Sequence, residues 1–183
     1  MSMQSEEKHN ELLETFALAE KLAKPYKRFL LHTSYNIRKP LFFYTKVLLM
    51  TQNIEQAEKT FNLPREQIND MRKKAAQFIN KHIQEKNKKY APIAIWLYNL
   101  ISIQPEKIIS DPDKLILTAL FEDKTLDSRI KYDFWSSIKE ALHVADPWIS
   151  DKIMDNLAQE ISLSQTSQVE PDAKPDSTAK LVA

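Results

Sequence analysis

Apolar residues recur every three or four positions along most of this chain, which is the period of one face of an α-helix. The longest such pattern begins at Pro64 and runs to about residue 88. Its apolar stripe consists of Ile68, Met71, Ala75, Phe78, Ile79, His82 and Ile83. The segment 92–104 is apolar almost all round, which predicts a helix buried at the centre of the fold. At about a dozen residues it is shorter than the roughly 20 that a membrane-spanning helix needs.

Prolines and capping residues mark where the predicted helices begin and end. Most of the nine prolines stand at the start of an apolar stretch of helical period, where the missing N–H has no hydrogen bond to lose. Asp111 before Pro112, and Asp146 before Pro147, add an acidic N-cap. Asn62 suits the left-handed conformation that often ends a helix. Besides the two segments above, the predicted helices cover 5–24, 25–37, a segment from Pro40 onward, 53–62, 112–122, 127–144 and 146–163.

The absence of glycine and cysteine excludes several kinds of chemistry. The 183 residues contain no Gly and no Cys. Phosphate-cradling loops, dinucleotide-binding turns and nucleophile elbows need glycine, and disulfides, thiolate zinc sites and thiol nucleophiles need cysteine. Tight β-hairpins also rely on glycine. With 43% hydrophobic and 28% charged residues the composition is that of a globular protein, so we expect an all-α fold, a compact bundle of about eight helices.

The expected organisation is one α-helical domain over residues 1–163 and a disordered polar tail over residues 164–183. The tail is rich in Ser, Thr, Asp, Pro and Lys and has no apolar period. The first eleven residues are polar and no signal peptide is visible, so we expect a cytoplasmic protein. The small apolar end at residues 180–183 leaves a lesser alternative, a bacterial effector exported through a C-terminal translocation signal.

Charge is unevenly distributed along the chain, although the net charge is only +1. Residues 1–20 carry one Lys and five Glu, a net charge of −4. Residues 21–90 carry 16 basic and five acidic residues, a net charge of +11, and residues 91–183 carry nine basic and 15 acidic residues, a net charge of −6. Such asymmetry indicates an anionic partner. The alternative is that the basic and acidic parts pair with one another across the fold.

Residues 56–75 resemble the helix-turn-helix motif of DNA-binding regulators. The apolar residues at the spacings of that motif are Ala57, Phe61, Leu63, Ile68 and Met71. The resemblance implies a turn at Asn62 and a second helix that enters the major groove, where Arg, Gln and Asn side chains can contact bases. The chain departs from the motif at Asn62, where Gly is usual, and at Glu58, where a small residue is usual. We expect a charge at that crowded helix contact to be poorly satisfied.

The residues expected to contact a macromolecule are polar and basic side chains of the 21–90 region. They are Lys27, Arg28, Arg38, Lys39, Arg65, Gln67, Asn69, Arg72, Lys73, Lys74 and Lys81. The partner expected first is an acidic protein, with nucleic acid as the main alternative. An anionic membrane surface is a lesser one, because aromatic residues are interleaved with the cations between residues 21 and 46. Either kind of partner is compatible with a homodimer.

Candidate catalytic and metal-binding residues are few. Glu6 with His9, and Glu140 with His143, have the Glu-x-x-His spacing of di-metal helical bundles, but no facing helix carries an inward glutamate. Single histidines among apolar neighbours, which we expect at the edge of the core, are His32 and His82. The sequence therefore predicts no enzyme, cofactor or metal, and favours a non-enzymatic adaptor or accessory protein.

Overall fold

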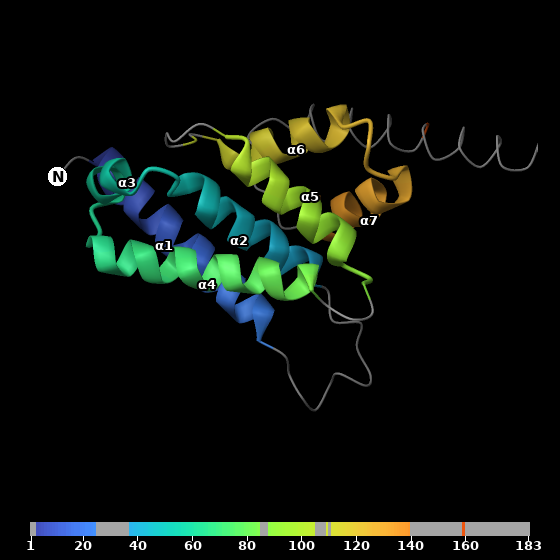
Figure 1. The fold of residues 1–183 in the computed structure, drawn as a ribbon. Coiled ribbons are helices and arrows are strands. Elements are labelled where there is room, and N and C mark those ends of the chain that lie inside the picture. The colour runs from blue at the N-terminus through green and yellow to red at the C-terminus, as the bar shows by residue number, and fades with distance from the viewer. Residues whose placement is uncertain are drawn as a thin grey trace, which may run out of the picture.

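The computed structural model describes residues 3–24, 37–84, 88–104, 109, 111–139 and 159. In these ranges the chain forms helices and no strand (Figure 1). They are α1 (Met3–Ala23), α2 (Arg38–Met50), α3 (Ile54–Phe61), α4 (Arg65–Ile83), α5 (Ala91–Ser102), α6 (Pro112–Glu122) and α7 (Ser128–Ile138). The prediction of an all-α bundle is confirmed, with seven helices in the described residues where about eight were expected.

Several predictions concern residues outside these ranges. They are the helix at 25–37 apart from Ile37, the helix at 146–163 apart from Gln159, the polar tail at 164–183 with its apolar end, and the side chains of Lys27, Arg28, His32, Glu140 and His143.

The central helix of the bundle is α2. Of its 13 residues, only Arg38, Lys39 and Lys46 are not buried, because apolar side chains surround this helix instead of forming one stripe. The helices α1, α4, α5, α6 and α7 all pack against it. Phe42 of α2 packs edge-on against Phe134 of α7, with ring centroids 6.2 Å apart. The broad apolar run that follows Pro40 in the sequence thus forms the middle of the core.

The prediction that segment 92–104 is buried on all sides is wrong. One face of α5 packs on α2, α4 and α7, with Ile93 and Leu97 in the core. The opposite face is exposed at Ile95 and Tyr98, and Ile103 just beyond the helix is exposed as well. The helix lies at the edge of the bundle, where outward positions are usually polar. Hydropathy alone cannot distinguish a buried helix from a surface helix whose outward face is apolar.

Capping residues mark several helix boundaries as predicted, whereas α2 begins at Arg38, two residues before Pro40, and α4 ends earlier than predicted. The Asp111 side chain accepts a hydrogen bond from the backbone N–H of Lys114 at 3.1 Å, which caps α6 as predicted. Asn62 ends α3 in the left-handed conformation, with φ of 52°. The helix α4 ends at Ile83 instead of residue 88. Lys88 has a φ of 55°, which cannot continue a right-handed helix.

The α3–α4 hairpin turns at Asn62, the position of the turn in the helix-turn-helix resemblance. Figure 1 shows α3 nearly end-on while α4 lies along the page, so the two helices cross steeply. The five apolar residues at motif spacing are all buried. The expectation for Glu58 is wrong: its carboxylate is half-exposed and accepts a hydrogen bond of 2.9 Å from Nε of Arg65. The residue buried at the helix contact is its neighbour, Ala57.

Candidate contact surface

Three helix termini meet at one end of the bundle, where α4 ends and α2 and α5 begin, whereas α1 ends to one side, below α4 (Figure 1). The guanidinium of Arg38, in the first turn of α2, lies 5.1 Å from the centre of the Tyr90 ring, directly before α5. That ring is 6.4 Å from the ring of His82 in the last turn of α4. Nζ of Lys74, in the middle of α4, lies 3.8 Å from Oε2 of Glu20, so the last turns of α1 lie beside the middle of α4.

Cations from these three termini gather at this end of the bundle, which we call the basic end. It consists of Arg38, Lys39, Lys81, Lys88 and Lys89. Arg38 and Lys39 are half-buried, and the three lysines from the other termini are exposed. The packing of the helices brings these charges together from two separate stretches of the sequence.

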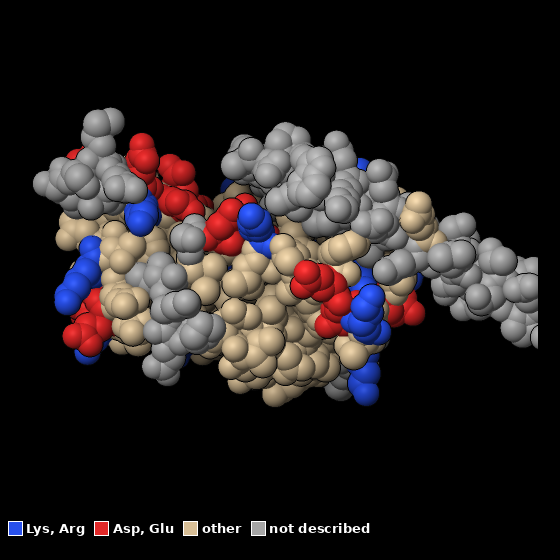
Figure 2. Space-filling model, turned by 90° about the horizontal axis from the view of Figure 1, so that it is seen from above, with Lys and Arg blue, Asp and Glu red and all other residues tan. Residues whose placement is uncertain are grey.

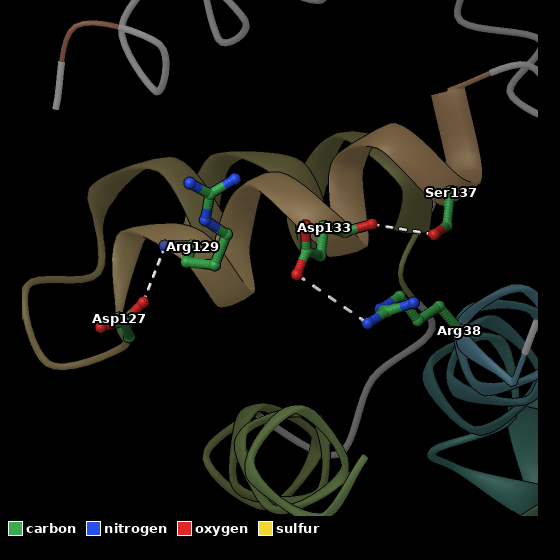
Figure 3. Close-up of polar contacts among 5 residues, drawn as sticks. All are labelled: Arg38, Asp127, Arg129, Asp133 and Ser137. Atoms are coloured by element: carbon green, nitrogen blue, oxygen red, sulfur yellow. Dashed lines mark hydrogen bonds and ion pairs between the residues drawn. The ribbon is translucent and has the colours of Figure 1, made fainter. Parts of the chain in front are cut away.

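The side chain of Arg38 is held in place by aromatic and acidic neighbours. It reaches from α2 toward α7, where Nη2 lies 3.9 Å from Oδ2 of Asp133 (Figure 3). The ring of Tyr90 packs against the same guanidinium. Farther along α7, the hydroxyl of Ser137 donates to the backbone carbonyl of Asp133 at 2.8 Å. Arg38 is therefore a fixed cation at the edge of the basic end. The charge that the basic end presents to solvent comes from its exposed lysines.

The helix dipoles reinforce the positive potential at the start of α2 and α5. A helix N-terminus carries a partial positive charge that an acidic residue usually offsets. The first turns of α2 and α5 contain no acidic residue, and the cations Arg38, Lys39 and Lys89 stand there instead. At the ends of α1 and α4, Lys21 and Lys81 face partial negative charges and offset them. The basic end is thus suited to an anionic surface.

Other predicted contact residues are engaged within the fold. Nη1 of Arg72 donates to the backbone carbonyl of Thr51 at 2.6 Å and to its hydroxyl at 3.0 Å. Burial lowers the pKa of Arg72 below its ordinary value, but an arginine remains charged at neutral pH. Lys74 also lies 3.4 Å from the carboxylate of Asp70. With Arg38–Asp133, the pair of Lys46 with Asp113 at 2.8 Å joins the basic block to the acidic C-terminal part of the chain.

The predicted base-reading side chains lie at the other end of α4. Arg65, Gln67 and Asn69 are exposed in its first turns, about 18 to 24 Å from Lys81 at a rise of 1.5 Å per residue. Gln67 and Asn69 line an open groove of about 530 Å³ together with Glu66, Asp70 and Lys73. Two carboxylates therefore share the face that would have to approach phosphates. The structure separates the candidate base contacts from the basic end.

A second groove, of about 550 Å³, lies between α1, α2 and α6 and is acidic. It is lined by Glu7, Asn10, Glu11, Glu14, Thr15, Leu18, Phe43, Lys46 and Asp113. The three glutamates are exposed on one face of α1, and Figure 2 shows acidic side chains gathered over this helix at the upper left. The −4 charge of the first 20 residues is thus displayed on the surface.

The described histidines have structural partners. Nδ1 of His9 lies 2.6 Å from the backbone carbonyl of Phe61, which links α1 to the end of α3. His82 is buried, and its Nδ1 lies 2.9 Å from the carbonyl of Phe78. Within the described part of the chain, no three His, Cys, Asp or Glu residues are grouped as metal ligands. No helix in the same ranges is long and apolar enough to cross a membrane.

Comparison of the sequence with protein-family models and with curated proteins, and of the structure with solved structures, gives no match. The function must therefore be argued from the residues themselves. Sequence reasoning did not single out Lys88 and Lys89, because their proximity to Arg38 depends on how the helices pack. It also missed the exposed face of α5, although the absence of charge in segment 90–104 was a visible signal.

Proposed function

We propose that this protein is a non-enzymatic helical adaptor that binds an acidic protein partner through the basic end. The observation that supports this most directly is the convergence of five cations from three helix termini. Long-range attraction would steer an acidic partner to this end and orient it, and the attraction would weaken as salt screens it.

Nucleic acid is the second candidate, because residues 56–75 resemble the helix-turn-helix motif and form two helices joined by a short turn. The distribution of charge favours the adaptor. In a groove-reading protein, cations that hold phosphates flank the helix that reads bases. Here the first turns of α4 carry Glu66 and Asp70, and Arg65 is paired with Glu58. The cations of the basic end lie instead at the far end of the same helix.

The proposal is tested by fluorescence anisotropy with a labelled polyglutamate peptide and a labelled mixed-sequence duplex DNA. We expect micromolar binding of the peptide at 50 mM salt and a large loss at 200 mM salt. The triple variant Lys39→Ala, Lys81→Ala, Lys88→Ala should weaken peptide binding at least tenfold. The matched control is Lys59→Ala, Lys114→Ala, Lys124→Ala, which removes the same charge from three lysines exposed elsewhere.

An equal loss in the two triple variants would mean that only net charge matters, and the basic end would not be a contact surface. Duplex DNA bound at least tenfold more tightly than the peptide would place the nucleic-acid function first. In that case Lys73→Ala should reduce the slope of log affinity against log salt by about one. Arg72→Ala is not a useful contact variant, because the side chain of Arg72 is bonded inside the fold.

A further inference from the structure

The outward face of α5 is uncharged and largely apolar. Ile95 is 43% exposed, Tyr98 is 51% exposed and Ile103 is 75% exposed. No Lys, Arg, Asp or Glu occurs between residues 90 and 104. Figure 2 shows the result, a wide uncharged area in the lower centre, on the side of the molecule where α5 lies. Contiguous exposed apolar surface on a folded protein marks a contact with another protein.

The exposed positions on this face complement one another about a two-fold axis. They are Pro92, Ile95, Tyr98, Asn99 and Ser102, which follow one another at helical spacings. If two copies of α5 pack antiparallel with the axis between Tyr98 and Asn99, Ile95 lies opposite Ser102 of the second copy. Tyr98 then lies opposite Asn99 of the second copy. Each large side chain meets a smaller one, as close helix packing requires.

Charge also favours a second copy over a different partner. In a two-fold contact the same surface patch of each copy meets its counterpart, so a charged face would bring like charges together. The outward face of α5 has none, whereas acidic and basic partners would be drawn to the basic end or to the groove of α1. Tyr98 and Asn99 can exchange hydrogen bonds across the axis, since a phenol and an amide each donate and accept.

We infer that two copies of this protein associate through the outward faces of their α5 helices, packed antiparallel about a two-fold axis. The strip from Pro92 to Ser102 is about 15 Å long at 1.5 Å per residue. One helix face of this length is smaller than a standard interface of about 800 Å² per partner, so the association is weak. Because α5 begins at the basic end, pairing places the two basic ends at opposite ends of the dimer. An elongated acidic partner would then be held at two points.

The test is sedimentation equilibrium of the full chain from 10 µM to 1 mM. We expect a monomer–dimer equilibrium with a dissociation constant near 100 µM, and we expect Ile95→Glu to raise that constant at least tenfold. Ile95 points outward, so this variant retains the core. The matched control is Leu18→Glu, which places the same charge at an exposed leucine of α1 and should leave the equilibrium unchanged.

Cysteine crosslinking gives a second measurement that does not depend on the fold of a charged variant. The chain has no cysteine, so Asn99→Cys supplies a single thiol beside the proposed axis, where mild oxidation should join two copies by a disulfide. Asn80→Cys, exposed on α4, should not form it at the same concentration. A monomer at 1 mM, a dimer that Ile95→Glu leaves intact, or equal crosslinking at both positions would each overturn the inference. None of these outcomes changes the polyglutamate titration that tests the basic end.

Discussion

The indole N–H of Trp96 on α5 donates a hydrogen bond of 2.7 Å to Oδ2 of Asp123, in the loop between α6 and α7. The other carboxylate oxygen of Asp123 accepts from the backbone N–H groups of Thr125 and Leu126 at 2.7 and 2.8 Å. The ammonium group of Lys131 on α7 donates to the backbone carbonyl of Asp123. One residue thus fixes the loop and joins three helices.

This arrangement makes stability depend on pH through Asp123. Burial would raise the pKa of Asp123, but the hydrogen bonds from Trp96, Thr125 and Leu126 outweigh it and lower the pKa from 3.8 to about 2. The ionised form is therefore the one that favours the fold. Its contribution is complete above about pH 5, and it is lost as pH falls toward 2.

We expect Asp123→Asn to reduce stability at pH 7 and to have a smaller effect at pH 3. The measurement is the urea midpoint of the natural chain and the variant at both pH values. Groups titrating elsewhere affect both proteins alike, so the difference isolates Asp123. A difference that stays constant between pH 7 and pH 3 would contradict this account. Trp96→Phe, which removes one donor, should reduce the effect of Asp123→Asn.

Arg72 is expected to contribute to stability through Thr51 and not to binding. Its guanidinium reaches the end of α2, where Nη1 donates to the backbone carbonyls of Leu48 and Thr51 at 3.3 and 2.6 Å. We expect Arg72→Ala to lower the free energy of unfolding by about 2 kcal/mol, because it removes charge-assisted hydrogen bonds and leaves the carbonyl of a buried residue without its donor.

The control for Arg72→Ala is Lys73→Ala, since Lys73 is the exposed neighbour on the same helix. It should change the free energy of unfolding by less than about 0.5 kcal/mol. Urea unfolding followed by circular dichroism measures both. Equal free energies of unfolding for the two variants would show that the hydrogen bonds of Arg72 at the end of α2 do not stabilise the fold.

Local signals in the sequence located most of the helices but not the surfaces. Asp111 and Asn62 act on backbone groups a few residues away, so cap positions can be read without knowledge of packing. The hydrogen bonds of Arg72 depend on the packing of α4 against the end of α2, some 20 residues earlier in the sequence. The basic end depends on two distant stretches of chain meeting, and the exposed face of α5 depends on its position at the edge of the bundle.

Glu58 is satisfied by an ion pair with Arg65, the first residue of α4. Its carboxylate lies 2.8 Å from Nη2 of Arg65, and both side chains are partly exposed. We expect Glu58→Gln to change the free energy of unfolding by less than about 0.5 kcal/mol, since exposed ion pairs contribute little. Thermal unfolding at low and high salt measures it. A loss above about 1 kcal/mol would indicate that Glu58 occupies the crowded contact that the motif has at this position.

Asn62 stands where a helix usually ends in glycine, and its φ of 52° is in the left-handed region that favours glycine. We expect Asn62→Gly to be more stable than Asn62→Ala by about 1 kcal/mol, because a Cβ is unfavourable in the left-handed conformation. Both variants lose the asparagine side chain, so the difference between them reports the backbone. The same pair at Asn80, an exposed residue inside α4, should show the reverse order, since glycine costs about 1 kcal/mol relative to alanine within a helix. Urea unfolding of the four variants measures both differences. If alanine were the more stable residue at both positions, the left-handed conformation of residue 62 would not be what ends α3 and sets the direction of α4.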